Sequence, residues 1–275
     1  MYPVLIHIGA FSLRTLVVFQ VLYFLATGFV LWRKSREEHY NEMEIFDSYL
    51  FSFIFALFFS RLVYIFLNFS EFGFEILKWF NFVSHPGSNN LAFLFAAGFY
   101  LYRYAIKKKW DAFEIIDFWV HAISLGLFFT YLGRLFDGSM FGKATNMPWG
   151  IIFPGVFEKR HPVQLYFAIF YLLLYVLLNW FENNYRTFEW YRAGKKAAQT
   201  GFLVAMFLII NAVFLFIMTF FKMPEIVVNG VTLDLWIYLF FLFFGFILLV
   251  KRSGKSIFPK KESKKLWKVQ QKQQK

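Results

Sequence analysis

Six polar side chains between residues 133 and 166 could together bind an anion and move a proton. They are Arg134, Asp137, Arg160, His161, Gln164 and Tyr166. A guanidinium group presents parallel N–H donors that suit the oxygens of a phosphate. An imidazole near a carboxylate and a phenol is a set from which a general base can be built. These residue types predict a phosphate-binding site with a titratable group beside it.

The backbone of this polar segment must turn sharply. Its glycines and prolines include Gly133, Gly138, Gly142, Pro148, Pro154 and Pro162. Glycine allows tight turns and close approach to a ligand, and proline excludes a regular helix. Non-helical backbone at a membrane surface is stable where it lines a cavity. The segment is therefore predicted to form the outer wall of a cavity the size of a lipid headgroup.

The chain around this segment is too apolar for a soluble domain of its length. Of its 275 residues, 59% are hydrophobic and 24% are aromatic. Apolar runs of about 20 residues, the length of a membrane-spanning helix, recur from end to end. They cover residues 11–32, 45–69, 89–106, 113–134, 163–181, 200–221 and 233–250. The sequence predicts an all-α integral membrane protein whose seven transmembrane helices form a single domain, residues 1–250.

Basic residues predict the orientation of these helices, because Lys and Arg accumulate on the cytoplasmic side of a membrane. They follow the first, third, fifth and seventh runs, in residues 33–36, 107–109, 186–196 and 251–275. The N-terminus and the polar segment are therefore predicted outside, and the C-terminus in the cytoplasm. The first twelve residues lack the basic region and cleavage site of a secretory signal, so the first run is predicted to stay as a helix.

Residues 251–275 form a basic tail. The tail holds ten Lys or Arg against the single acid Glu262, and so carries nine of the twelve net positive charges. It could contact anionic lipid headgroups or RNA. It could also be an orientation signal that is otherwise disordered. This last interpretation is favoured, and nucleic-acid binding is not expected.

Ionisable residues inside the apolar runs are costly and suggest further sites. Arg61 lies about 24 Å along the second run, at the depth predicted for Arg134. The two could clamp one phosphate, or each could anchor its own helix. Asp117, His121 and Ser124 share one face of the fourth run. A local Asp–His pair is favoured there over a general base, because His121 is about 20 Å along the helix from Arg134.

The absence of cysteine limits the chemistry of the chain. It excludes disulfides, thiol nucleophiles and thiolate metal ligands within the chain. No metal site and no cofactor is predicted.

Several motifs, in order along the chain, resemble those of one known family. They are "SRLVY" at residues 60–64, "GRL" at 133–135, "GSMFGK" at 138–143, "PWGIIFPG" at 148–155 and "RHPVQLY" at 160–166. Together with Asp117 after the "KKKW" loop, they make the chain resemble the prolipoprotein diacylglyceryl transferases. That family has seven membrane helices in the orientation predicted above.

The resemblance implies an activity, a location and roles for residues. Such enzymes transfer a diacylglyceryl group from phosphatidylglycerol to the thiol of a lipobox cysteine in a preprolipoprotein, and they release glycerol phosphate. The implied location is the bacterial cytoplasmic (inner) membrane. Arg134 is implied to be the donor on the phosphate side. The other matching positions, implied to bind the phospholipid or support the site, are Arg61, Tyr64, Arg160, His161, Gln164 and Tyr166.

Several positions depart from the family's pattern and remove polar groups. Leu16 stands at the family's helix-one tyrosine, and Leu91, Ala92 and Phe93 stand at its His-Gly-Gly motif. Ser139 and Phe167 stand at two of its glutamates, and Leu215 and Thr219 stand at its arginine and a further glutamate. Asp137 is the nearest replacement for an asparagine. Losing one catalytic donor typically costs about 10²–10³ in rate. The fold and the outer cavity are therefore predicted to be kept, while the chemistry is open.

Two functions follow from these patterns. The first is a diverged transferase in which His161, Arg134 and Asp137 have taken over proton transfer and phosphate binding. The second is a catalytically silent phospholipid-binding or scaffolding protein on the same fold. A transporter has little support, because no pair of broken helices recurs in the two halves. The transferase is the predicted function because the resemblance extends over several motifs.

Overall fold

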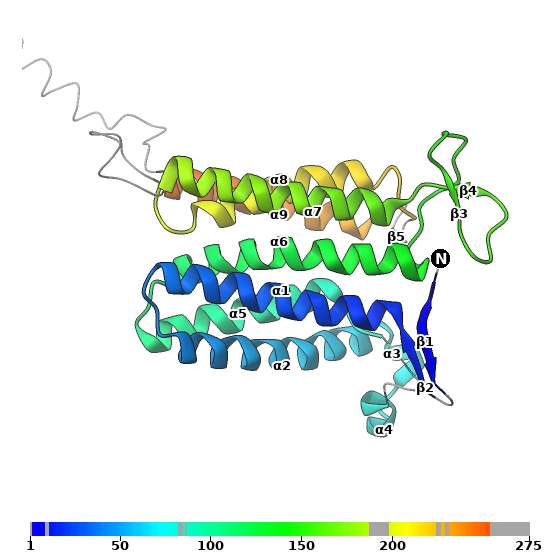
Figure 1. The fold of residues 1–275 in the computed structure, drawn as a ribbon, viewed down its shortest axis with the longest axis horizontal. Coiled ribbons are helices and arrows are strands. Elements are labelled where there is room, and N and C mark those ends of the chain that lie inside the picture. Colours follow the sequence, from blue (N-terminus) through cyan, green and yellow to red (C-terminus); the bar gives the residue numbers. More distant parts are fainter. Residues whose placement is uncertain are drawn as a thin grey trace, which may run out of the picture.

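Long helices run side by side along one axis in the computed structural model, which describes residues 2–8, 11–81, 85, 87–186, 198–223, 227–228 and 231–253 (Figure 1). The long helices are α1 (Thr15–Glu37), α2 (Glu42–Leu67), α5 (Asn90–Lys108), α6 (Ala112–Asp137), α7 (Val163–Phe181), α8 (Phe202–Met218) and α9 (Leu233–Arg252). Each overlaps one of the predicted apolar runs. The mostly helical prediction is confirmed.

Five helices in the described part of the chain are long and apolar enough to cross a membrane. They lie at residues 15–37, 42–67, 112–137, 163–185 and 234–252, while α8 is a shorter apolar helix. These lengths and compositions indicate a multi-pass membrane protein. The number of seven spans and the orientation of the termini stay predictions.

Short hairpins at the helix ends add β-structure that the all-α prediction lacks. Strands β1 (Val4–Ile8) and β2 (Phe11–Arg14) pair antiparallel. The prediction of helix from residue 11 is therefore wrong for its first four residues. The helix begins at Thr15, whose hydroxyl donates to the carbonyl oxygen of Tyr2. The other two hairpins pair β3 (Ile151–Ile152) with β4 (Lys159–Arg160) and β5 (Val227–Val228) with β6 (Val231–Thr232).

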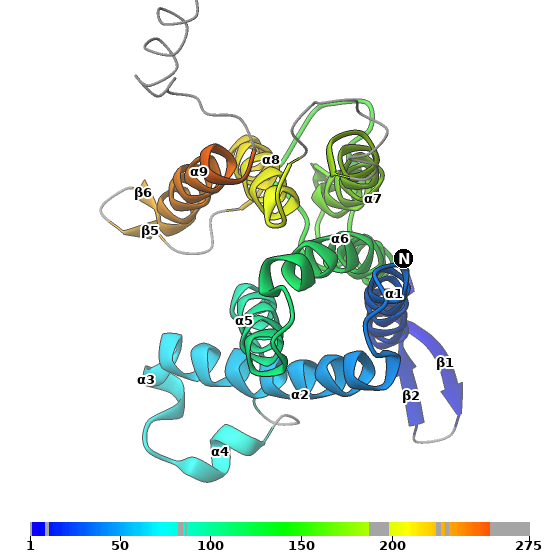
Figure 2. The ribbon, with the colours of Figure 1, turned by 90° about the vertical axis from the view of Figure 1, so that its left-hand side faces the viewer.

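In the described part of the chain, three short helical segments extend beyond the predicted runs. They are α3 (Phe69–Phe72), α4 (Ile76–Phe80) and the π-helix η1 (Glu182–Arg186) that extends α7. The α3–α4 segment projects sideways from the end of α2 (Figures 1 and 2).

Helix α6 lies between two groups of helices (Figure 2). On one side α1, α2 and α5 complete a four-helix arrangement with it, and on the other side lie α7, α8 and α9. Gly126 lets α1 come close, since a Cβ at this position would be 2.4 Å from Thr27 Cγ2. Small residues allow this kind of close helix packing within a membrane.

The two ends of the bundle differ in composition. One, the hairpin end, carries β1–β2, α3–α4 and β3–β4 (Figure 1). The other, the basic end, carries the short α1–α2 and α5–α6 turns with the lysines of residues 107–109. Asn41 and Asp111 cap the helices that leave these turns, accepting hydrogen bonds from Glu44 N and Phe113 N. Most of the predicted basic tail, residues 254–275, lies outside the described residues.

Candidate active site at the hairpin end

The C-terminus of α6 builds the first wall of the site. Gly138 adopts φ +81°, where glycine is favoured, and its N–H donates to the carbonyl oxygen of Arg134 at 3.0 Å. The chain then reverses through Ser139 and Met140, and Met140 also has a positive φ of 63°. The family-like segment thus begins in a tight turn, as its glycines predict.

The guanidinium group of Arg134 lies under this turn with a weak partner. Its Nη1 donates to Met140 Sδ at 2.9 Å, and the ring of Tyr131 lies 5.9 Å away. Among the residues that the structure describes, the thioether is its one hydrogen-bond acceptor, and thioether sulfur is a weak acceptor. The side chain is only partly buried. Arg134 is therefore a cation with donors available to an anionic ligand.

Gln164, in the first turn of α7, ties that helix to the turn. The side chain is fully buried, and Nε2 donates to Ser139 O at 2.6 Å. Its Oε1 has no hydrogen-bond partner within the described part of the chain. A buried acceptor of this kind requires an explanation. A hydroxyl group of a ligand would supply the missing donor.

His161 lies just before α7 in a small β-arrangement. Its backbone exchanges hydrogen bonds with Gly142 N and Lys143 O, and Lys143 N donates to Phe221 O. Its Nδ1 is 3.2 Å from Tyr166 Oη, and the ring of Phe221 packs edge-on at 5.1 Å. The imidazole is thus held by the hydroxyl of Tyr166 and by packing against the Phe221 ring.

Arg160 lies beside this site, and Asp137 lies at the end of α6. Arg160 donates to Gly142 O at 3.4 Å, lies 3.8 Å from Glu158 and stacks on Phe141. Asp137 is the partly buried last residue of α6. Its carboxylate makes no hydrogen bond to His161 in the described part of the structure. The structure therefore places Gln164 against the turn that contacts Arg134, and His161 beside Tyr166, with Asp137 at the end of α6.

Arg61 and Tyr64 form a separate cluster on α2. Arg61 is only 4% exposed, and it donates to the carbonyl oxygens of Trp79, Gly87 and Lys78 at 3.0, 2.9 and 3.4 Å. The Tyr64 ring lies 5.8 Å from the guanidinium carbon. These contacts fasten the α3–α4 segment to α2.

The structure also shows which partners Asp117 and His121 have. The predicted Asp–His pair holds only through the backbone, since His121 Nδ1 faces the carbonyl oxygen of Asp117 at 3.0 Å. The Asp117 carboxylate accepts from Gly201 N at 2.7 Å and Val204 N at 3.0 Å, at the N-terminus of α8. A buried carboxylate suits a helix N-terminus, whose first N–H groups lack partners.

The sequence reasoning missed Lys222, which follows α8. Its ammonium group donates to Asp234 of α9 and to Tyr238 Oη at 3.1 Å. Burial lowers the pKa of Lys222, but the hydrogen bonds to Asp234 and Tyr238 outweigh it and raise the pKa above the ordinary 10.5. The sequence signal that could have identified this pair is a lysine just after one apolar run and an aspartate at the start of the next.

The fold and the site define a multi-pass helical membrane protein with a polar, loop-built site at one end. The chain belongs to the prolipoprotein diacylglyceryl transferase family, whose model matches residues 3–251. The resemblance seen in the motifs is thereby confirmed.

Curated relatives carry one description. The chain is 28% identical over 258 residues to a phosphatidylglycerol–prolipoprotein diacylglyceryl transferase of Idiomarina loihiensis, with 90% of this chain and 92% of that protein covered. It is 27% identical to the enzyme so described in Aeromonas hydrophila, covering 81% and 78%. The relative in Bordetella avium is 31% identical over 56% of each chain.

Proposed function

We propose that this chain transfers the diacylglyceryl group of phosphatidylglycerol to a cysteine thiol of a prolipoprotein at the site between α6 and α7. The observation that carries the proposal is Arg134, a partly buried guanidinium group whose one hydrogen-bond acceptor within the described residues is a thioether. A phosphate is the ligand that such a group fits best. The names of the relatives supply the two substrates.

The residues of the site can be given roles in that reaction. With its proton on Nδ1 and donated to Tyr166 Oη, His161 keeps a lone pair on Nε2 that can accept the thiol proton. The sulfur then attacks the glyceryl carbon, the bond from that carbon to the phosphate oxygen breaks, and glycerol phosphate leaves with the electron pair. Arg134 stabilises the leaving phosphate. Gln164 Oε1 accepts a hydrogen bond from a glycerol hydroxyl, and Arg160 supplies a second positive charge on the same polar segment.

The same proposal includes topology. Seven spans with the N-terminus outside and the C-terminus in the cytoplasm would place the hairpin end at the outer face of the bacterial inner membrane. Phosphatidylglycerol and an exported prolipoprotein could both reach the site there. Residues 1–250 would form the membrane domain, and residues 251–275 a tail that contacts anionic headgroups.

A second candidate is a silent phospholipid-binding protein on this fold. It is favoured by the first turn of α5, where Leu91, Ala92 and Phe93 place apolar groups at the family's His-Gly-Gly position. Within the described residues, Asp137 also makes no hydrogen bond to His161. Both candidates need Arg134 for the phosphate, and only the transferase releases glycerol phosphate.

Purified protein in phosphatidylglycerol nanodiscs separates the two candidates. We expect bound phosphatidylglycerol in the wild type, and release of glycerol phosphate when a lipobox peptide is added. Arg134→Gln should lower both, whereas Arg36→Gln, an exposed arginine at the basic end, should lower neither. Retained lipid without release in the wild type would favour the silent protein. Equal lipid binding and release by Arg134→Gln would contradict both candidates.

A further inference from the structure

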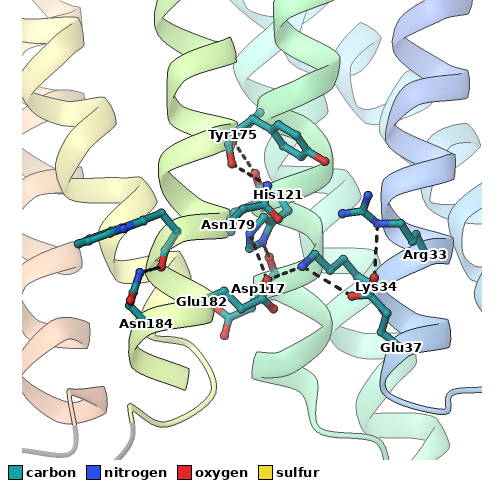
Figure 3. Close-up of polar contacts among 12 residues, drawn as sticks. Arg33, Lys34, Glu37, Asp117, His121, Tyr175, Asn179, Glu182 and Asn184 are labelled. Carbon is teal, nitrogen blue, oxygen red and sulfur yellow. Dashed lines mark hydrogen bonds and ion pairs between the residues drawn. The ribbon is translucent and has the colours of Figure 1, made fainter. Parts of the chain in front are cut away.

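A buried ionic cluster joins α1, α6 and the π-helix η1, which extends α7, toward the basic end of the bundle (Figure 3). Lys34, His121 and Glu182 are 6%, 0% and 7% exposed. Charged and titratable groups are rarely buried to this extent unless they are paired. The cluster is therefore a specific feature of the fold, and the proposed reaction does not use it.

Two nitrogens converge on one oxygen in this cluster. Lys34 Nζ donates to Glu182 Oε2, and His121 Nε2 lies 3.5 Å from that same atom. Lys34 also has a second carboxylate within reach on its own helix, since Glu37 Oε2 is 3.7 Å from Nζ. Arg33 Nε is 3.5 Å from the other oxygen of Glu37.

The hydrogen bonding of His121 determines what its second nitrogen can do. Nδ1 faces the backbone oxygen of Asp117 at 3.0 Å, and a carbonyl oxygen only accepts, so Nδ1 carries a proton. In the neutral ring, Nε2 then points a lone pair toward the Glu182 carboxylate. Nε2 has no hydrogen-bond partner among the described residues. The contact becomes a charge-assisted hydrogen bond only when the ring gains a second proton.

The other neighbours of the ring include the backbone of Leu178 on α7, which also interacts with His121. On α7 the edge of the Tyr175 ring packs against His121, with centroids 6.5 Å apart. On α6 the Asp117 carboxylate is bound to the N–H groups of Gly201 and Val204 in α8. Glu182 is therefore the carboxylate for which Lys34 and a protonated His121 compete.

We propose that Lys34, His121 and Glu182 form a proton-sensitive clasp between α1 and α7. While His121 is neutral, Glu182 pairs with Lys34 and holds α1 against α7. When His121 is protonated, its Nε2–H binds Glu182, and Lys34 moves to Glu37 on its own helix. His121 keeps its place because it is fully buried in α6, whereas Lys34 already reaches the exposed Glu37. Acidification on the side of the basic end would thus release α1 from α7.

The chain offers a direct test because it contains no cysteine. Phe29→Cys and Val176→Cys, at exposed positions of α1 and α7 that are 54% and 58% accessible, would carry a pair of spin labels in nanodiscs. Between about pH 8 and about pH 4, a range wide enough for the charge change of a buried histidine, we expect the distance between the labels to increase by about 2 Å. His121→Gln should abolish this increase. His39→Gln, at an exposed histidine of the α1–α2 turn, should keep it.

A second variant tests the exchange of partners and does not alter a buried residue. The Glu37 side chain is 54% exposed, so Glu37→Gln is expected to fold normally. It removes the carboxylate to which Lys34 would move, and should reduce the pH-dependent increase in distance. An unchanged response in His121→Gln or in Glu37→Gln, or a wild type whose distance does not depend on pH, would overturn the clasp.

Discussion

Arg61 and Arg134 show how partners, and not residue type, decide the role of an arginine. Both lie toward the hairpin end of their helices. The Arg61 guanidinium is buried and satisfied by three carbonyl oxygens, whereas that of Arg134 is partly exposed and bonded to a sulfur. A satisfied guanidinium holds protein segments together, and an unsatisfied one can bind a ligand. We therefore assign Arg61 to the α3–α4 junction and propose that Arg134 binds the phosphate.

Arg61→Ala should mainly lower stability. It would leave three carbonyl oxygens without their charged donor, at a cost on the order of 2–3 kcal/mol in the free energy of unfolding. Arg134→Ala should cost less stability, because it removes only a weak sulfur contact. Thermal unfolding of both variants in detergent measures the difference. A fully stable Arg61→Ala protein that had lost phospholipid binding would instead favour the predicted two-arginine clamp.

Residue types in the site could be read from the sequence, but their partners could not. Gln164, His161 and Tyr166 are brought together as their spacing at the start of α7 suggests. Met140 and Ser139 become partners of Arg134 and Gln164 only through the tight turn after α6. Such contacts depend on backbone path, which hydrophobic periodicity does not determine.

At the scale of elements, the first residue of a helix cannot be located from a continuous apolar sequence alone. Residues 11–14 are apolar enough to extend the helix, yet they pair with residues 4–8 in a hairpin. The α7 boundaries were predicted correctly because Pro162 fixes the helix start. Apolar periodicity did not predict the contact between Lys222, which follows α8, and Asp234 in the first turn of α9.

The Lys222–Asp234 pair should make stability depend on alkaline pH. Because the pKa of Lys222 is raised by folding, its contribution is fully present below the ordinary 10.5 and is lost as pH rises through the higher folded value. Lys222→Met should therefore unfold at a lower temperature than the wild type at pH 8. The difference in melting temperature between Lys222→Met and the wild type should narrow as the pH rises above 10.5. A gap that stays constant across this range would show that the pair contributes no charge-dependent stability.

At the scale of the whole molecule, α6 joins the two groups of helices. Its buried Asp117 reaches across to the first N–H groups of α8, so one carboxylate links both groups. The prediction that Asp117 lies on this helix is correct. Its link to α8 could not be predicted, because residues 117 and 201 are distant in the sequence.

Asp117→Asn tests this link. The amide keeps one acceptor oxygen but replaces the other with a donor, so one buried N–H of α8 loses its partner at a cost of about 1–3 kcal/mol. Asp111→Asn is the matched control, because Asn caps a helix about as well as Asp. Urea unfolding of the two variants should separate them. Equal stabilities would mean that the α6–α8 contact is held by packing alone.

The measurement closest to the central claim is the intact mass of a lipobox-cysteine peptide incubated with this protein in phosphatidylglycerol nanodiscs. The proposed transfer predicts that the peptide gains the mass of one diacylglyceryl group. The gain should be lost with Arg134→Gln or with a peptide in which serine replaces cysteine. An unchanged peptide mass, beside a family member that modifies the same peptide, would contradict transfer by this chain.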